Sequence, residues 1–90
     1  MSSYSIRFTK SAKKEFHKLP KKIQARVVEA LNVLATNPYS ELLKVKKLRG
    51  EEELFRTRIG DYRLLYQVQG GKLIVLVIKI GHRREVYKKR

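Results

Sequence analysis

Between residues 53 and 80 the sequence follows a period of two, and two glycine-containing dipeptides interrupt it. Strands are predicted at about 53–59, 62–69 and 72–80, joined by Gly60-Asp61 and Gly70-Gly71. Both dipeptides are typical of tight hairpins, and the first suits a type II′ turn with glycine at its first central position. The pattern predicts a three-stranded antiparallel meander, which the rest of the chain has to cover.

The turn at Gly60-Asp61 also predicts which side chains share a face of the sheet. With a two-residue turn, Ile59 pairs with Tyr62, and Arg58 lies directly across from Arg63. Arg56 then joins Arg58 and Arg63 on one face. The other face is apolar and can pack on helices; it carries Phe55, Thr57, Ile59, Tyr62, Leu64, Tyr66 and Val68.

The arginine face is costly for stability. Like charges directly opposite each other on a sheet destabilise it by an amount comparable to the roughly 0.2–1 kcal/mol of a favourable pair. Converging guanidiniums suit phosphate, because each offers a planar fork of donors for two oxygens. The alternative is a solvated basic face that forms ion pairs with Glu51, Glu52 or Glu53. The run from Leu73 to Ile78 is apolar at every position, so the last strand is expected to be central and buried on both faces.

The N-terminal half predicts one strand and a helical hairpin. Tyr4, Ile6 and Phe8 alternate with polar residues, as in a half-buried strand. Two helices follow: a short one, with Thr9 or Ser11 as N-cap and Pro20 closing it, and a longer one from Pro20 to about Asn37-Pro38. Their apolar stripes are Ala12, Phe16 and Leu19, then Ile23, Val27, Ala30, Leu31 and Leu34.

Residues 39–50 show no clear period and are predicted to form a basic connecting loop. The order β-α-α-β-β-β defines an α+β fold, a mostly antiparallel twisted sheet with a helical hairpin packed on one face. We expect residues 1–90 to form a single domain.

The charge of the chain points to a polyanionic partner. Lys and Arg number 22 against 8 Asp and Glu, a formal net charge of +14, and nucleic acid is the leading candidate. A membrane surface is disfavoured, because the basic residues are spread over several elements. No signal peptide or membrane span is predicted, so we expect a cytoplasmic protein. Cysteine is absent, which excludes disulfides and thiolate metal sites.

The C-terminal segment from Gly81 concentrates groups that can do chemistry. His82 can exchange a proton near neutral pH, Arg83 can bind phosphate, and Tyr87 can donate a hydrogen bond or proton. No clustered carboxylates suit Mg²⁺ and no zinc spacing is present, so neither a metal nor another cofactor is predicted. A site built from arginine, histidine and tyrosine side chains can cleave RNA without a metal, because the 2′-hydroxyl of the RNA itself is the nucleophile.

Four segments in this order resemble the RelE/ParE toxin superfamily over nearly the whole chain: residues 8–16 with Leu19-Pro20, residues 43–50 ending in Lys47-Leu48-Arg49-Gly50, residues 60–66 and residues 81–87. Similarity to RelE implies the fold described above and an mRNA interferase that cuts the message in the ribosomal A site. It also implies a 2′,3′-cyclic phosphate product and a cognate acidic antitoxin, RelB-like, that neutralises the toxin.

The resemblance carries site residues onto this chain by position. They are Arg56, Arg58, Arg63, Arg83 and Tyr87. RelE has lysines at the first two positions, and arginine stays protonated at any relevant pH, so we expect the arginines to orient substrate and neutralise charge. Proton transfer is then expected from His82 and Tyr87. Contacts with messenger and ribosomal RNA are predicted at Lys44, Lys46, Lys47, Arg49, Arg84 and Lys88.

Two other functions remain open from the sequence. A ParE-like toxin would share the fold and poison DNA gyrase, without RNA-cleaving residues. A non-catalytic RNA-binding module would keep the basic loop and lose nothing when Arg83 or Tyr87 is replaced.

Overall fold

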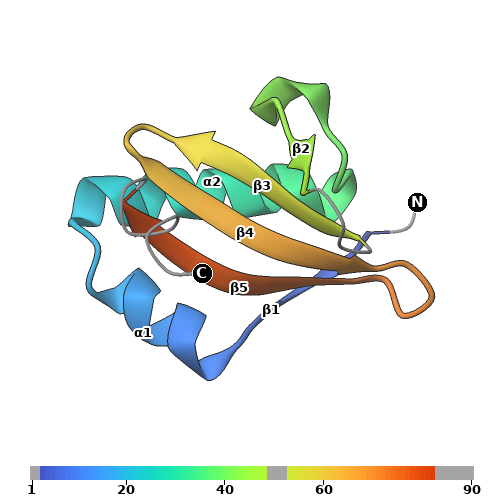
Figure 1. Ribbon diagram of the computed structural model, residues 1–90, viewed down its shortest axis with the longest axis horizontal. Helices are drawn as coiled ribbons and strands as arrows, with labels where there is room; N and C mark the ends of the chain where they lie inside the picture. The colour runs from blue at the N-terminus through green and yellow to red at the C-terminus, as the bar shows by residue number, and fades with distance from the viewer. Residues whose placement is uncertain (1–2, 49–52, 83–90) are drawn as a thin grey trace.

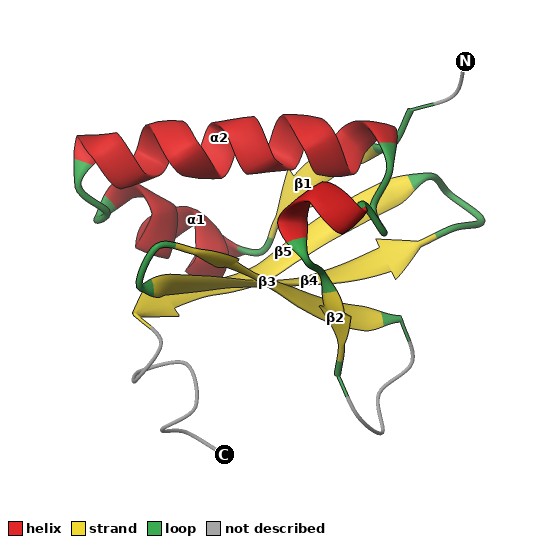
Figure 2. Ribbon diagram, turned by 90° about the horizontal axis from the view of Figure 1, so that it is seen from above, coloured by secondary structure: helices red, strands yellow, loops and turns green. Residues whose placement is uncertain are grey.

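The computed structural model describes residues 3–48 and 53–82. In these ranges a five-stranded sheet of order β1-β5-β4-β3-β2 carries helices on one face (Figures 1 and 2). The elements are β1 (Ser5–Phe8), α1 (Lys10–His17), α2 (Lys21–Thr36), a 3-10 turn (Glu41–Leu43), β2 (Lys46–Lys47), β3 (Leu54–Ile59), β4 (Tyr62–Gln69) and β5 (Ile74–His82). Only β1 and β5 pair in parallel. The predicted α+β fold is confirmed, and the predicted elements occur in the expected order with β2 as an additional strand.

The helices begin and end where the sequence signals place them. Thr9 is the N-cap of α1, and its hydroxyl oxygen accepts the Ala12 backbone N–H at 3.1 Å. Pro20, whose fixed φ suits a helix start, immediately precedes α2. Neither helix in the described ranges is long and apolar enough to cross a membrane.

The core lies between the helices and the inward face of the sheet. From β3, β4 and β5 it includes Phe55, Ile59, Leu64, Tyr66, Val68, Val75, Val77 and Ile80, and from the helices Ala12, Val27, Ala30, Leu31 and Leu34. This is the apolar face that the sequence predicts. The Tyr66 hydroxyl donates to the Pro38 carbonyl at 2.7 Å. Burial, and then the nearby Tyr39, raise the pKa of Tyr66 far above its usual value, so its hydroxyl stays a donor.

β5 departs from the prediction on its outward face and at both ends, whereas Val75 and Val77 on its inward face are buried as predicted. It lies between β1 and β4, as expected of an interior strand, but Ile74, Leu76 and Ile78 are only half-buried. Leu73 stands outside the strand, in a four-residue loop (residues 70–73), at a φ of 54°. The tight turn predicted at Gly70-Gly71 is therefore wrong. In its place, backbone bonds from Lys72 N–H to the Gln69 carbonyl and from Leu73 N–H to the Gly70 carbonyl close two overlapping turns.

The loop predicted over residues 39–50 contains two short elements that periodicity cannot reveal. The 3-10 turn (Glu41–Leu43) is capped by Ser40, whose hydroxyl oxygen accepts the Leu42 N–H at 3.1 Å. β2 then pairs with β3, with Lys46 opposite Arg56. Both are set by contacts with the chain around them, and a two-residue strand is too short to show a period.

Glu15 of α1 extends the pairing of β5 beyond the end of β1. Its Oε1 accepts the Ile80 backbone N–H at 2.8 Å, while its Oε2 lies 2.7 Å from Lys79 Nζ. The carboxylate thus takes the place of a strand at this edge of β5. The ion pair itself is partly exposed, with Lys79 at 36% and Glu15 at 26% of side-chain exposure, so the bond to the backbone is expected to matter more.

We predict that Glu15→Ala lowers the free energy of unfolding by about 1–2 kcal/mol, because the Ile80 N–H loses its acceptor. Glu15→Gln keeps an acceptor oxygen and is expected to lose less than half of that. Urea unfolding monitored by circular dichroism measures both, with the exposed helical Glu29→Ala as control. Equal losses for the alanine and glutamine variants would assign the effect to charge and contradict the role of the backbone contact.

Candidate functional site

The β3–β4 hairpin gathers three arginines on the face of the sheet that is turned away from the helices. Arg58 lies directly opposite Arg63, and Ile59 opposite Tyr62, so the predicted register is confirmed. Gly60 has a φ of +64°, a conformation that the tight turn requires and that other residues rarely adopt. Lys46 of β2 pairs with Arg56, which adds a lysine to the same face.

The three arginines differ in their access to solvent. Arg58 is exposed and Arg56 is half-buried, whereas Arg63 is only 7% exposed. Arg63 pairs across β4 and β5 with Gly81, and a neighbour without a side chain leaves room for a long one. Arg56 and Arg58 can therefore meet a ligand directly, while Arg63 contributes a fixed charge beneath them.

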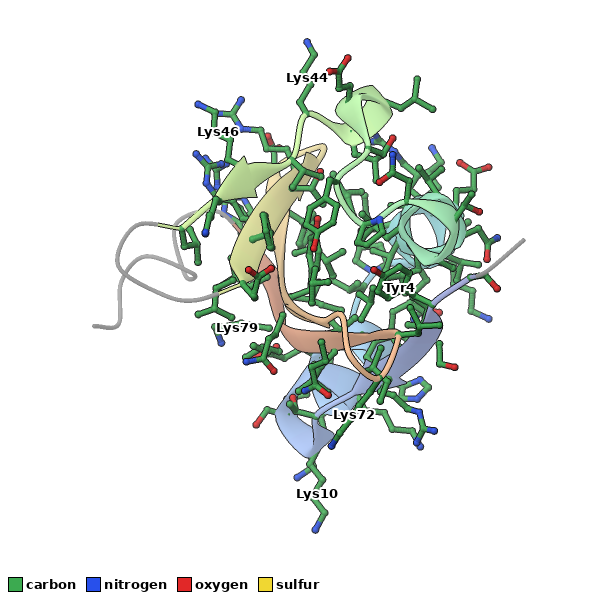
Figure 3. The ribbon with its side chains drawn as sticks, turned by 90° about the vertical axis from the view of Figure 1, so that its right-hand side faces the viewer. Tyr4, Lys10, Lys44, Lys46, Lys72 and Lys79 are labelled. Carbon is green, nitrogen blue, oxygen red and sulfur yellow. The ribbon has the colours of Figure 1, made fainter. Side chains whose placement is uncertain are left out.

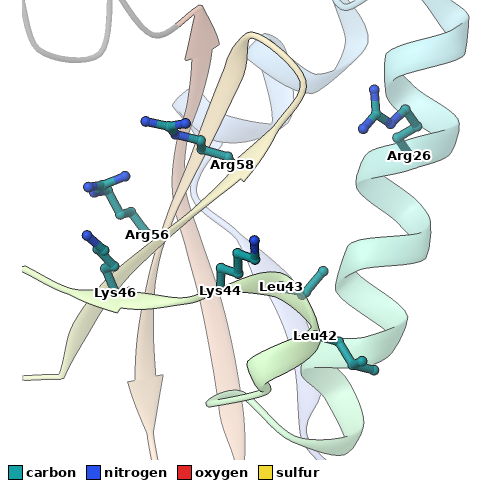
Figure 4. A pocket seen from close by; sticks show the side chains of 7 residues that line it. All are labelled: Arg26, Leu42, Leu43, Lys44, Lys46, Arg56 and Arg58. Atoms are coloured by element: carbon teal, nitrogen blue, oxygen red, sulfur yellow. The ribbon is translucent and has the colours of Figure 1, made fainter.

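A cavity of about 490 Å³ lies where the end of β3 beyond its pairing with β2 faces α2, and we call it the basic cleft (Figure 4). Its lining residues are Arg26, Leu42, Leu43, Lys44, Lys46, Arg56 and Arg58. Five of the seven are Lys or Arg and none is acidic. The structure thus brings two predicted catalytic residues, Arg56 and Arg58, together with two predicted RNA contacts, Lys44 and Lys46. Figure 3 shows Lys44 and Lys46 at one end of the molecule, away from Lys10 and Lys72.

Thr57 holds the loop that forms one wall of this cleft. Its hydroxyl donates to the Leu43 carbonyl at 2.6 Å, from the inward face of β3. Directly after Leu43 the chain turns back at Lys44, which has a φ of 50°, and enters β2. Thr57 therefore fixes the position of Lys44 and Lys46 relative to the arginines. The alternation of the strand predicts only that Thr57 lies on the apolar face, because a bond between two distant segments leaves no signal in the sequence.

His82 lies on the other side of the sheet from the arginines. It pairs with Tyr62, and the two rings meet edge to face at 5.7 Å. Both line a cavity of about 520 Å³ that also includes Glu15, Lys18 and Lys79. The reason is a β-bulge: Leu65 pairs with Lys79 but Tyr66 with Val77, so Ile78 is an extra residue and reverses the alternation beyond it. The proton-transfer role of His82 stays a prediction.

The remaining predicted residues divide into two groups. Lys47 is exposed but pairs with Phe55, which puts it on the opposite face of β2 from Lys46. Outside the described residues lie Arg49, Arg83, Arg84, Tyr87 and Lys88. Over residues 3–48 and 53–82, His, Asp and Glu side chains form no group of three or more that could hold a metal ion.

Arg26 belongs to the cleft and was not predicted. The helical period places it on the outside of α2, among other exposed residues. Nothing in the sequence shows that this point of α2 faces the β3–β4 turn, because that proximity arises only when the helix packs across the sheet.

Comparison with known proteins places the chain in a family. Residues 6–87 match the family described as ParE toxin of type II toxin-antitoxin system, parDE. The toxin RelG of Mycobacterium tuberculosis is 39% identical, covering 96% of this chain and 98% of that protein. The mRNA interferase toxin RelE of Escherichia coli K12 is 33% identical, covering 94% and 90%.

The fold agrees with a solved structure. In the intact Escherichia coli RelBE toxin-antitoxin complex, a chain 31% identical matches with a TM-score of 0.77, covering 88% of this chain and 95% of its own length. This chain therefore belongs to the RelE/ParE superfamily of type II toxin-antitoxin systems.

We predict that Thr57→Val loosens the loop at the basic cleft without disturbing the rest of the sheet. Valine fills the same space but cannot donate to the Leu43 carbonyl, so the free energy of unfolding is expected to fall by about 1–2 kcal/mol. Amide hydrogen exchange should quicken at residues 42–47 and stay unchanged in β4. Thr57→Ser, which keeps the donor, is the control. Uniformly faster exchange through the sheet would show that Thr57 acts on the core alone.

Proposed function

We propose that this chain is a toxin that cleaves messenger RNA as a metal-independent endoribonuclease, acting on the ribosome in the cytoplasm. The observation that carries the proposal is the convergence of Arg56, Arg58 and Arg63 on one face of the sheet, at a cost in stability. The similarity to the Escherichia coli protein named mRNA interferase toxin RelE supports it.

The reaction needs no nucleophile from the protein. It needs side chains that align the 2′-hydroxyl with the phosphorus and positive charge that stabilises the transition state. The 2′-hydroxyl of one ribose attacks the adjacent phosphorus and loses its proton, the bond to the 5′-oxygen of the next nucleotide breaks, and that oxygen takes up a proton. A 2′,3′-cyclic phosphate and a free 5′-hydroxyl result. Negative charge grows on the phosphoryl oxygens in the transition state, and fixed guanidiniums stabilise it there. Arg56 and Arg58 contact the oxygens in this scheme, and Arg63 adds a buried charge.

The proton transfers require groups other than arginine, which stays protonated. We assign them to Tyr87, with Arg83 as a further guanidinium. His82 is the second candidate, and its place beside Tyr62 on the far side of the sheet means that it would have to act across the end of β5.

An acidic antitoxin is the proposed partner that silences the toxin. A chain of formal charge +14 attracts acidic proteins as well as RNA. The related toxin in the Escherichia coli RelBE complex is bound to its antitoxin. Covering the arginine face would block access of RNA to the proposed site.

Poisoning of DNA gyrase is the second candidate, because the family that matches residues 6–87 carries the name of ParE. Expression of the chain in bacteria, followed by mapping of message 5′ ends, distinguishes the two. We expect cuts at positions set by the codon in translated messages, within minutes of induction. Intact messages together with an SOS response would refute the nuclease.

We predict that Arg58→Ala separates activity from stability. Loss of a transition-state contact should lower kcat for ribosome-bound message about 10²–10³-fold. The same change removes a like charge opposite Arg63, so the free energy of unfolding should stay level or rise by up to about 1 kcal/mol.

Arg7→Ala is the matched control, since Arg7 is exposed on the same face of the sheet but on β1, paired with Leu76. A message with 2′-deoxyribose at the cut position should resist cleavage by the wild type. If Arg58→Ala cleaves at the wild-type rate, or falls no further than Arg7→Ala, the arginine face is not the catalytic surface.

A further inference from the structure

The basic cleft holds more positive charge than the proposed reaction uses. Arg56 and Arg58 reach the linkage to be cut, but Arg26 comes from a different layer of the structure, on α2 (Figure 4). Arg58, Arg56 and Lys46 extend to one side of β3 in this view, and Arg26 projects from the helix on the other side. The cleft therefore extends from the arginine face past the end of β3, beyond its pairing with β2, to α2.

Close packing against a glycine sets the position of Arg26. A Cβ atom added to Gly60 would lie 3.2 Å from Arg26 Nη1, so the guanidinium rests on the β3–β4 turn. Gly60 is two residues from Arg58, which lines the cleft together with Arg26 and also a smaller adjoining cavity. Arg26 thus stands next to the arginine face, although α2 packs on the opposite face of the sheet.

No acidic side chain of the described residues neutralises this guanidinium. The ion pair found over residues 3–48 and 53–82 joins Lys79 to Glu15, on α1. Glu29, one turn along α2, borders the adjoining cavity but forms no ion pair with Arg26 within that part of the chain. A concave surface with several cations and no counterion concentrates positive potential, and an anion entering it gains from all of them.

We propose that the basic cleft is a backbone subsite that binds a phosphate of the message next to the linkage being cut, with Arg26 as its principal contact. This inference rests on the proposed function. The strand would pass from the arginine face around the edge of β3 to α2, where Lys44 and Arg26 flank it. Leu42, which is 83% exposed at the mouth of the cleft, offers an apolar surface to a sugar or base.

Phosphate suits the site for reasons of geometry. Arg26 and Arg58 each present a planar fork that can hold two oxygens of one phosphate, and phosphates recur at regular intervals along RNA. The contact is independent of the base and of the 2′-hydroxyl. Acidic side chains of an antitoxin are the other possible occupant, but the continuity of the cleft with the arginine face favours the nucleic acid strand.

The test compares Arg26→Ala with Lys22→Ala, which removes one exposed positive charge from the same helix outside the cleft. Binding of a fluorescein-labelled single-stranded RNA oligonucleotide is followed by anisotropy over a range of salt concentrations. For Arg26→Ala we expect the log-log salt slope to fall by about 0.7, the value for one phosphate contact on a single strand. Affinity should drop about three- to tenfold.

Three further results should accompany that loss. A DNA oligonucleotide of the same sequence should show the same change in slope, because only phosphate is contacted. Arg26→Lys should restore the slope, and Lys22→Ala should match the wild type. On ribosomes carrying message, Arg26→Ala should raise KM with kcat nearly unchanged, since the contact lies outside the reacting linkage.

The possible failures are distinguishable. If the wild type cleaves message and Arg26→Ala behaves like Lys22→Ala, the subsite is wrong and the proposed function stands. If the wild type neither binds nor cleaves RNA, both fail. If Arg26→Ala weakens binding only to ribosomes without message and leaves oligonucleotide binding intact, the contacted phosphate belongs to ribosomal RNA and the message subsite is wrong. If Arg26→Ala weakens only the binding of the antitoxin, the message subsite is wrong as well.

Discussion

The register between β3 and β4 determines both the core and the charged surface of this protein. Because the strand period is two, a slip of one residue would turn Phe55 and Tyr66 outward and bring the arginines into the core. The two-residue turn at Gly60 excludes that slip, because the positive φ of Gly60 allows a tight turn that fixes the register of the two strands. The inward aromatic residues and the outward guanidiniums are thus two consequences of the same constraint.

The magnitudes explain why the juxtaposed arginines persist. Repulsion between Arg58 and Arg63 costs at most about 1 kcal/mol, whereas each large side chain buried on the inward face contributes roughly 1.5–3 kcal/mol. The apolar face of β3 and β4 has several such residues. Their burial stabilises the register by much more than the repulsion between the arginines destabilises it, so the outer face can carry unfavourable charge. An accumulation of this kind is typical of surfaces selected for binding an anion.

Local sequence signals were sufficient for the parts of the fold that depend on neighbours along the chain. Helix caps, apolar periodicity and the Gly60 turn predicted both helices, four of the five strands and the pairing of Arg58 with Arg63. They failed where a contact spans distant segments. β2 is defined by its pairing with β3, the loop before it is held by Thr57, and Arg26 reaches the cleft only across the packed layers. The sequence therefore predicted one part of the candidate site, the arginines of the β3–β4 hairpin, and missed the part that depends on packing between layers.

The bulge at Ile78 explains the separation of His82 from those arginines. Strict alternation from Val77 would have placed His82 on the arginine face and Gly81 on the other. The extra residue is fixed from the opposite edge, where the Thr9 hydroxyl donates to the Ile78 carbonyl at 3.2 Å and Glu15 accepts the Ile80 N–H. Gly81 consequently lies beside Arg63, and His82 turns toward the helices. Since arginine cannot serve as a base, the proposed mechanism needs another group for proton transfer on the arginine face, and we assign that role to Tyr87.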